Sequence, residues 1–238
     1  MALTKRAARP HPAPSLAVTA YRKLRRDIIR CRLKPGEDVS EAQLAEHYAL
    51  GKTPIREGLA RLAHEGLVQS LPRRGYRVAP ITLADARELL SFRAIIETEA
   101  ARLAAGRCNV AQLRRLDILC RVGYDPDDAK SVERFLTANT ELHATIALAT
   151  GNAFLSAAVI QTLDQMERLL YAALELAGSR KSWSHEHRAL VDALAKRDGE
   201  RAAKAVADQI KGVERMILDV AMNSESVAKL NLGAQAAR

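Results

Sequence analysis

Residues 40–66 read SEAQLAEHYALGKTPIREGLARLAHEG and contain two short amphipathic segments separated by a tight link. The first begins at Ser40, whose hydroxyl can cap a helix in a Ser-x-x-Gln capping box. The second begins at Thr53-Pro54, a good N-cap followed by a residue suited to the first helical position, and Gly66 ends it. Two short helices joined by a tight turn, the second with a basic N-terminal end, are typical of a helix-turn-helix.

The segments on either side of this motif complete a small domain. A first helix is expected from Leu16 to Arg32, where apolar residues recur at helical spacing and basic residues cover the rest. After the motif, residues 67–71 and 76–79 read as two short strands around Pro72-Arg73-Arg74-Gly75, a hairpin with a doubly charged tip. The sequence therefore predicts a winged helix-turn-helix over residues 16–80, with a small β-hairpin as its wing.

The charge is distributed unevenly along the chain. Residues 1–80 hold 16 Lys and Arg against 7 Asp and Glu, whereas residues 81–238 hold 21 of each, so the whole net charge of +9 lies in the first third. This asymmetry favours an N-terminal domain that binds a polyanion, while a merely solvated basic surface is the alternative. A basic domain with a helix for the major groove and a wing for the neighbouring phosphates indicates duplex DNA.

A longer set of residues carries a family resemblance. It comprises Leu44-Ala45-Glu46, the run from Gly51 to Leu59, Arg61-Leu62, the run from Glu65 to Val68, and Arg73-Arg74-Gly75. Together they resemble the winged-helix domain of the GntR family of bacterial regulators. Two positions depart from the family pattern: Ala42 stands where some members carry a DNA-contacting Arg, and Gly58 replaces the usual Ala, which costs ~1 kcal/mol of helix propensity.

The resemblance implies which side chains meet DNA. Arg56 lies where side chains reach base edges, and Arg pairs bidentately with guanine; an ion pair one turn along its own helix is the alternative. Arg61 contacts either phosphate or only the next turn of the fold. The expected DNA-binding residues are Lys52, Thr53, Arg56, Arg61, Arg73, Arg74 and Gly75.

From Ile81 onward the sequence has helical periodicity and shows no competing strand pattern. It predicts an all-α antiparallel helical bundle over residues 81–222, so the chain as a whole is mainly α. Residues 1–15 and 223–238 are expected to be flexible tails. The helices are expected at about residues 83–105, 109–122, 129–150, 153–178, 184–196 and 199–222.

Four short motifs lie along these helices. They are Arg93-x-x-x-Glu97-x-x-Ala100-Ala101, Asn139-x-x-x-His143 with Gly151-Asn152 after it, Glu186-His187 followed by Leu190, and Asp198 followed by Ala202-Ala203. Together they resemble the FCD ligand domain of the FadR-type branch of GntR regulators. Many members hold a divalent metal with an Asp or Asn and three His, and a small carboxylate effector completes the coordination. The resemblance carries this metal set onto Asn139, His143, His187 and Gln209.

Two kinds of effector site remain open. Asn139 and Gln209 offer neutral amide oxygens, which are weak ligands for Zn or Ni, whereas two imidazoles are good ones. The other reading is a polar pocket that binds its ligand directly. Arg93 could clamp a carboxylate there, or instead pair with Glu97 one turn away. The expected effector-binding residues are Arg93, Asn139, His143, His187 and Gln209, and His185 is expected in solvent.

The function that these features favour is a metabolite-responsive transcription regulator. We expect a homodimer that binds a pseudo-palindromic operator and is released from it by a small carboxylate, as a repressor. A constitutive architectural DNA binder is the alternative, but it would need no inward polar cluster. A metal-dependent hydrolase is disfavoured because no carboxylate accompanies His143 and His187 at a recognisable spacing.

The remaining features concern the compartment. The three cysteines, Cys31, Cys108 and Cys120, are far apart and contain no CxxC pair, so we expect reduced thiols. No apolar run approaches the length of a membrane span, and the N-terminus has no apolar signal segment. The sequence therefore predicts a cytoplasmic bacterial protein that associates with the nucleoid through DNA, with no membrane partner.

Overall fold

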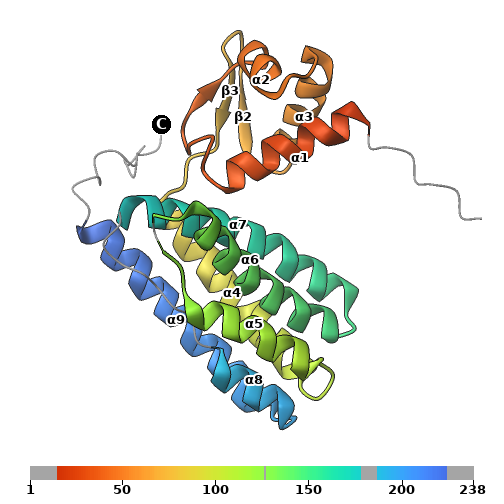
Figure 1. Cartoon of the computed structure of the whole chain (residues 1–238), viewed down its shortest axis with the longest axis vertical. Coiled ribbons are helices and arrows are strands. Elements are labelled where there is room, and N and C mark those ends of the chain that lie inside the picture. The colour runs from red at the N-terminus through yellow and green to blue at the C-terminus, as the bar shows by residue number, and fades with distance from the viewer. Residues whose placement is uncertain (1–14, 126, 178–186, 224–238) are drawn as a thin grey trace, which may run out of the picture. The chain divides into compact units, whose positions relative to one another are not determined.

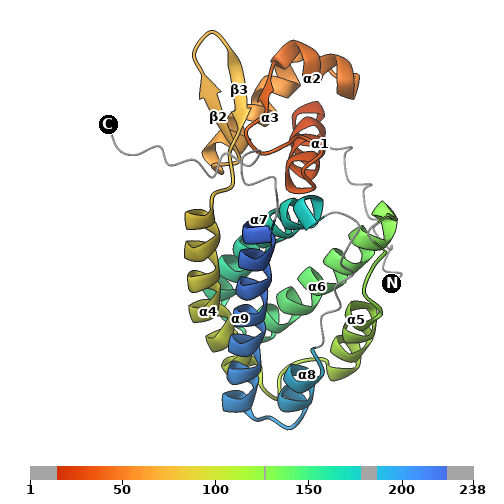
Figure 2. The ribbon, with the colours of Figure 1, turned by 90° about the vertical axis from the view of Figure 1, so that its left-hand side faces the viewer.

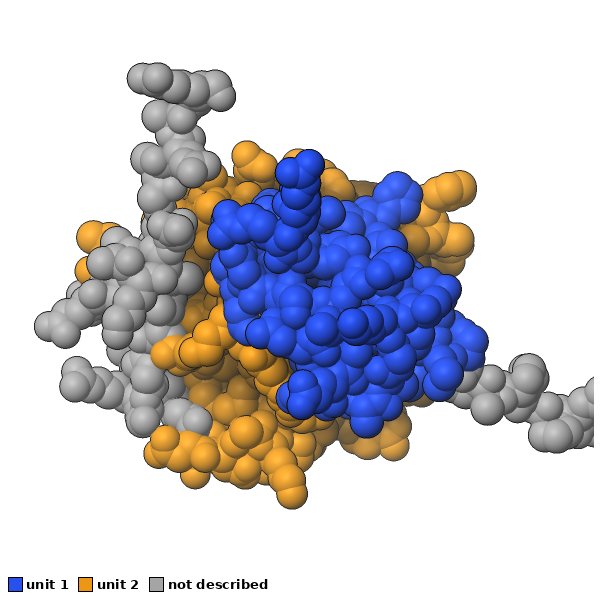
Figure 3. All heavy atoms as spheres, turned by 90° about the horizontal axis from the view of Figure 1, so that it is seen from above, with its two compact units in different colours: residues 1–28, 36–79 blue, residues 29–35, 80–238 orange. Residues whose placement is uncertain are grey.

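The computed structural model of the chain describes residues 15–125, 127–177 and 187–223. The chain divides into two compact units, one of residues 1–28 and 36–79 and the other of residues 29–35 and 80–238 (Figures 1 and 3). Apart from Ser15 and Asn223, the two predicted tails lie outside the described residues, as does His185.

The first unit contains a three-helix arrangement and a small sheet. Its helices are α1 (Leu16–Ile29), α2 (Glu41–Tyr48) and α3 (Lys52–His64), and its strands are β1 (Asp38–Val39), β2 (Val68–Leu71) and β3 (Gly75–Val78). The strands form an antiparallel sheet in the order β1-β3-β2, and β2 and β3 make the predicted hairpin wing (Figure 1). The fold is a winged helix-turn-helix.

The strand β1 and the end of α1 differ from the sequence prediction. The strand β1 was not predicted, because two residues carry no readable alternation. The first helix ends at Ile29 and not at Arg32, since Cys31 has a φ of +53°, which takes the backbone out of the right-handed helix. Residues 29–35 belong to the second unit.

The two helices of the helix-turn-helix begin in different ways. Ser40 caps α2 with the predicted capping box, in which the Gln43 backbone N–H donates to the Ser40 hydroxyl at 3.2 Å. For α3 the prediction was wrong, because Gly51 and not Thr53 is the N-cap. Pro54 is thus the third helical residue, where its missing N–H still costs nothing because the first N–H groups of a helix have no intrahelical partner.

Gly58 has a packing role in this unit. A Cβ atom at this position would lie 3.1 Å from the Tyr21 backbone nitrogen and 3.2 Å from Leu24 Cδ1. The glycine therefore lets α3 approach α1 closely, which accounts for its departure from the usual alanine.

The second unit is built from helices throughout its described residues. They are α4 (Leu83–Ala104), α5 (Val110–Val122), α6 (Ala129–Ala149), α7 (Ala153–Ala177), α8 (Arg188–Ala195) and α9 (Gly199–Asn223). Helix α9 runs alongside α4, and α6 packs between α5 and α7 (Figure 2). The helix predicted at 184–196 begins at Arg188, after His187 at the N-cap position; residues 184–186 lie outside the described part.

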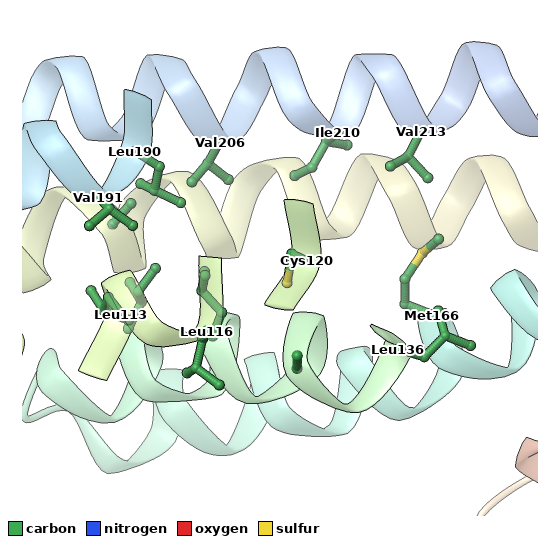
Figure 4. Close-up of a cluster of buried hydrophobic side chains, with 14 of the residues drawn as sticks. Leu113, Leu116, Cys120, Leu136, Met166, Leu190, Val191, Val206, Ile210 and Val213 are labelled. Atoms are coloured by element: carbon green, nitrogen blue, oxygen red, sulfur yellow. The ribbon is translucent and has the colours of Figure 1, made fainter. Parts of the chain in front are cut away.

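The core of this unit is assembled from α5 to α9 and the inner face of α4. Figure 4 shows the labelled side chains pointing toward one another from opposite sides of the bundle. Leu113, Leu136 and Leu190 are fully buried, and Cys120 lies among them as a small apolar group. In the part of the chain that the structure describes, none of the helices combines the length and the apolar character that a membrane span requires.

Candidate functional site

The N-terminal end of α3 presents its polar side chains to solvent. Lys52, Thr53 and Arg56 are all exposed, whereas Ile55 and Leu59 on the opposite face are buried. The three predicted DNA-binding residues of this helix are therefore accessible, which a contact between the first helical turn and the major groove requires.

Arg56 is held by a carboxylate from the neighbouring helix. Its Nε donates to Glu41 Oε1 and Oε2 at 2.9 and 3.0 Å, and its Nη2 donates to Glu41 Oε2 at 2.8 Å. These hydrogen bonds hold the pKa of Glu41 below its usual value. Arg56 is therefore ion-paired, but with α2, and not with the next turn of its own helix as the alternative supposed.

Arg61 takes part in a contact network between α1 and the end of α3. Its guanidinium carbon lies 3.7 Å from the centre of the Tyr21 ring, and its Nε donates to Glu65 at 3.2 Å. The Tyr21 hydroxyl donates to the same carboxylate at 2.8 Å. Of the two roles considered for Arg61, these contacts favour the one within the fold.

The tip of the wing is exposed and its backbone is unusual. Arg73 and Arg74 are exposed, and Arg73 has a φ of +62°. At Gly75, φ is +99° and a Cβ atom would lie 2.5 Å from the Val39 carbonyl oxygen. Gly75 is therefore needed where β3 passes β1, and this requirement exists without any contact to DNA.

One ion pair at the base of the wing was missed by the sequence analysis. Arg77 donates to Asp38 through Nε at 2.6 Å and Nη2 at 2.9 Å, and the two residues are register partners of β3 and β1. The pair depends on β1, the strand that the sequence did not predict.

In the helical unit, a cavity lies between α4, α6, α7 and α9. Its polar lining comes from Arg93, Asn139, His143 and Gln209, and apolar residues of α6, α7 and α9 form the rest. The space open to the centre of a water molecule is about 20 Å³, which is enough for roughly one water. Four of the five predicted effector-binding residues therefore meet at one cavity.

Behind this lining, Glu97 joins two of the predicted residues. Arg93 donates to both oxygens of Glu97, through Nε to Oε1 and through Nη2 to Oε2 at 3.2 Å, and His143 Nδ1 lies 2.8 Å from Oε2. All three side chains are buried. Burial raises the pKa of Glu97, but Arg93 and His143 outweigh that effect and lower it to about 2. The carboxylate is therefore ionised and fixes the orientation of both neighbours.

His187, the fifth predicted residue, lies one layer further from the cavity. It is fully buried, and its ring is edge-on to that of His143, with the centroids 5.3 Å apart. Its backbone N–H donates to Asp117 Oδ1 of α5 at 2.8 Å. His187 does not line the cavity, so the structure gives it a supporting position.

Comparison with known proteins places both units in one family. The family description "Bacterial regulatory proteins, gntR family" matches residues 16–78, and the FCD domain matches residues 88–212. The chain is 30% identical over 200 residues to BphR of Paraburkholderia xenovorans (strain LB400), an uncharacterized HTH-type transcriptional regulator, and the match covers 80% of each chain. The chain belongs to the GntR family.

A second relative and a solved structure are also similar to this chain. The HTH-type transcriptional repressor RspR of Escherichia coli (strain K12) is 25% identical over 211 residues, which cover 88% of this chain and 92% of RspR. The solved structure of E. coli McbR/YncC has the same fold, with a TM-score of 0.69 at 19% identity, and covers 87% of this chain and 99% of that one. The chain is a GntR transcription regulator with an FCD domain, and it is not an enzyme.

Carboxylates lie beside both histidines in the fold, although at spacings that the sequence does not reveal. Glu97 contacts His143 and Asp117 contacts His187, so carboxylates do accompany both histidines. They come from α4 and α5, at distances along the chain where no spacing rule applies. Glu97 does not act as a general base, since a carboxylate whose pKa is about 2 binds a proton too weakly near neutral pH.

The donor set in this FCD domain does not fit zinc or nickel. Across the described ranges, no three His, Cys, Asp or Glu side chains come together as a metal group. The polar side chains at the cavity supply one imidazole and two amides, and His143 Nδ1 already faces Glu97. Amide oxygens are weak ligands for these metals, so no step of the function is derived through a metal here.

Proposed function

We propose that this GntR regulator is a homodimeric repressor that binds a pseudo-palindromic operator and is released by a small carboxylate metabolite. The cavity of the FCD domain carries this proposal. It joins an arginine, an imidazole and two amides to an otherwise apolar lining, which is the composition of small-molecule sites. Such a lining binds a carboxylate by hydrogen bonds and its carbon chain by apolar contact.

The small size of the cavity supports a coupling between effector and fold. A space of about 20 Å³ does not admit a metabolite, so the side chains or helices that line it would have to rearrange when one binds. A ligand that prefers the open arrangement shifts the protein toward it, and that shift is the change the DNA-binding domain would sense.

The DNA-binding half of the proposal rests on the exposed basic residues of unit 1. Lys52, Thr53 and Arg56 would meet the operator at the recognition helix, and Arg73 and Arg74 would lie along phosphates beside the wing. RspR, a repressor by its name, is similar over most of both chains, which supports repression here. Two such domains in a dimer would read two half-sites related by a two-fold axis.

A thermal-shift screen of small carboxylic acids with the full-length protein tests the effector site. Gln209→Ala is the informative variant because Gln209 lines the cavity and is only half-buried, whereas truncating Arg93 would leave Glu97 charged and buried. An effector should raise the wild-type Tm by several degrees and that of Gln209→Ala by clearly less.

Asp208→Ala is the matched control for this screen. Asp208 is the preceding residue of α9, is exposed and pairs with Lys204 at 2.9 Å. Its variant should respond like the wild type. Equal responses of the wild type and Gln209→Ala to every acid that binds would place the effector elsewhere and refute the proposed site.

A further inference from the structure

We propose that Glu41 is a specificity-determining residue of this regulator, because it fixes the guanidinium of Arg56 in the orientation that reads a base. This inference rests on the proposed contact between Arg56 and the operator and adds a residue that the family resemblance does not assign. Glu41 is itself an acid on the DNA-binding domain, so it positions Arg56 and does not bind phosphate.

The hydrogen bonds to Glu41 leave part of the Arg56 guanidinium able to donate to DNA. Glu41 occupies Nε and one hydrogen of Nη2, so both hydrogens of Nη1 and the second hydrogen of Nη2 remain. The Arg56 side chain is 64% exposed while Glu41 is 23% exposed, so the carboxylate is the more buried partner and the guanidinium is the more accessible one. The open edge, which carries Nη1 and Nη2, can still make a bidentate contact to the O6 and N7 atoms of a guanine.

Stability gives no sufficient reason for this pair. An ion pair whose arginine is 64% exposed contributes little to folding, since solvent screens it and both side chains lose freedom. A residue that contacts a base gains more from such a pair, because an arginine that is already ordered loses less conformational entropy when it binds the base. Glu41 begins α2 directly after the cap residue Ser40, and this rigid helix end makes it a firm anchor.

The charge of Glu41 adds a second effect with the same result. A carboxylate near the DNA surface repels phosphates and weakens binding to any duplex, whatever its sequence. A duplex with a guanine in reach of Arg56 offsets that cost, and other duplexes do not. Glu41 should therefore increase the difference in affinity between operator and non-operator DNA.

The test compares variants of the full-length protein on two duplexes. The first is the tightest binder that the wild type selects from a random library, and the second is a scrambled duplex of equal length and composition. For each variant, the ratio of the two Kd values measures specificity. Glu41→Ala should lower this ratio about fivefold to twentyfold, part of what one bidentate base contact supplies.

Glu57→Ala is the matched control for charge. Glu57 is an exposed acid next to Arg56 on α3, so its removal changes the net charge equally. It should tighten binding to both duplexes without lowering the ratio. Glu41→Gln keeps a polar side chain at the start of α2 and should fall between Glu41→Ala and the wild type.

Arg56→Ala separates the two proposals. If it leaves the ratio unchanged, Arg56 does not read the operator and both ideas fail. If it lowers the ratio while Glu41→Ala behaves like Glu57→Ala, only the role of Glu41 fails. A further loss of ratio from Glu41→Ala in the Arg56→Ala background would equally overturn positioning, since Glu41 should act only through Arg56.

Discussion

The backbone of the wing requires a residue without a Cβ atom at position 75. Gly75 combines a φ of +99° with a position where a Cβ would lie 2.5 Å from the Val39 carbonyl oxygen. Gly66 has a similar φ of +72° but has nothing within 4 Å of its virtual Cβ. The two glycines therefore separate backbone strain from steric conflict.

Gly75→Ala should destabilise the DNA-binding domain more than Gly66→Ala. Each substitution places an alanine in the left-handed region, at a cost of about 1–2 kcal/mol. Only Gly75→Ala must also push β1 away from β3. Denaturant unfolding of both variants measures the difference, and equal losses of free energy would show that β1 yields without cost.

For individual side chains, some contact partners could be predicted from the sequence and others could not. Arg93 and Glu97 are four residues apart on one helix, so their pairing was foreseeable as an alternative to a carboxylate clamp. The contact of Glu97 with His143 was not, because it joins α4 to α6 across 46 positions. Glu41 was hidden for another reason: an acid in the first turn of a helix already has a plausible role beside the helix dipole.

Among the elements, α4 has an outer face that a lone domain leaves uncovered. Phe92, Ile95 and Leu103 are exposed on it, and Phe154 and Ile160 are exposed on the neighbouring α7. Figure 2 shows α4 along one edge of the helical unit. We propose this face as the contact with a second copy in the homodimer, since exposed apolar patches on soluble proteins mark association surfaces.

Ile95→Glu should convert the dimer into a monomer. Ile95 is 67% exposed on the outer face of α4, so a charge there leaves the monomer folded but would be buried without a partner in the dimer. Light scattering after size exclusion measures the mass. Leu119→Glu on α5, at 52% exposure, is the control and should remain dimeric. Dissociation of the control alone would move the interface to α5.

In the whole molecule, effector and operator should affect each other reciprocally. If each prefers a different arrangement of the dimer, an acid found in the thermal-shift screen lowers operator affinity by the same factor by which the operator lowers affinity for the acid. Factors of about 5–150 are typical of such coupling. Titrating the operator with and without the acid, and the acid with and without the operator, measures the two factors. If neither ligand changes the affinity for the other, the protein is a constitutive DNA binder.

Most of the helices and strands of this protein follow from its amino-acid sequence alone. Helical periodicity, the cap at Ser40, the glycines and the charge asymmetry predicted a basic winged helix-turn-helix followed by a helical bundle, because these signals act over a few neighbouring residues. Local rules also misplaced the start of α3, since Thr53-Pro54 and Gly51 are both acceptable helix starts and the helix begins directly after Gly51.

The contacts between distant side chains became visible only in the folded protein. The fold placed Glu41 against Arg56, Glu97 against His143 and β1 beside the wing, and it separated His187 from the cavity that the other four residues line. These contacts join segments many residues apart, and their geometry follows from how the helices pack. A sequence carries no local signal for such distances, and that is why it predicted the elements and the residue types but not the arrangement of the sites.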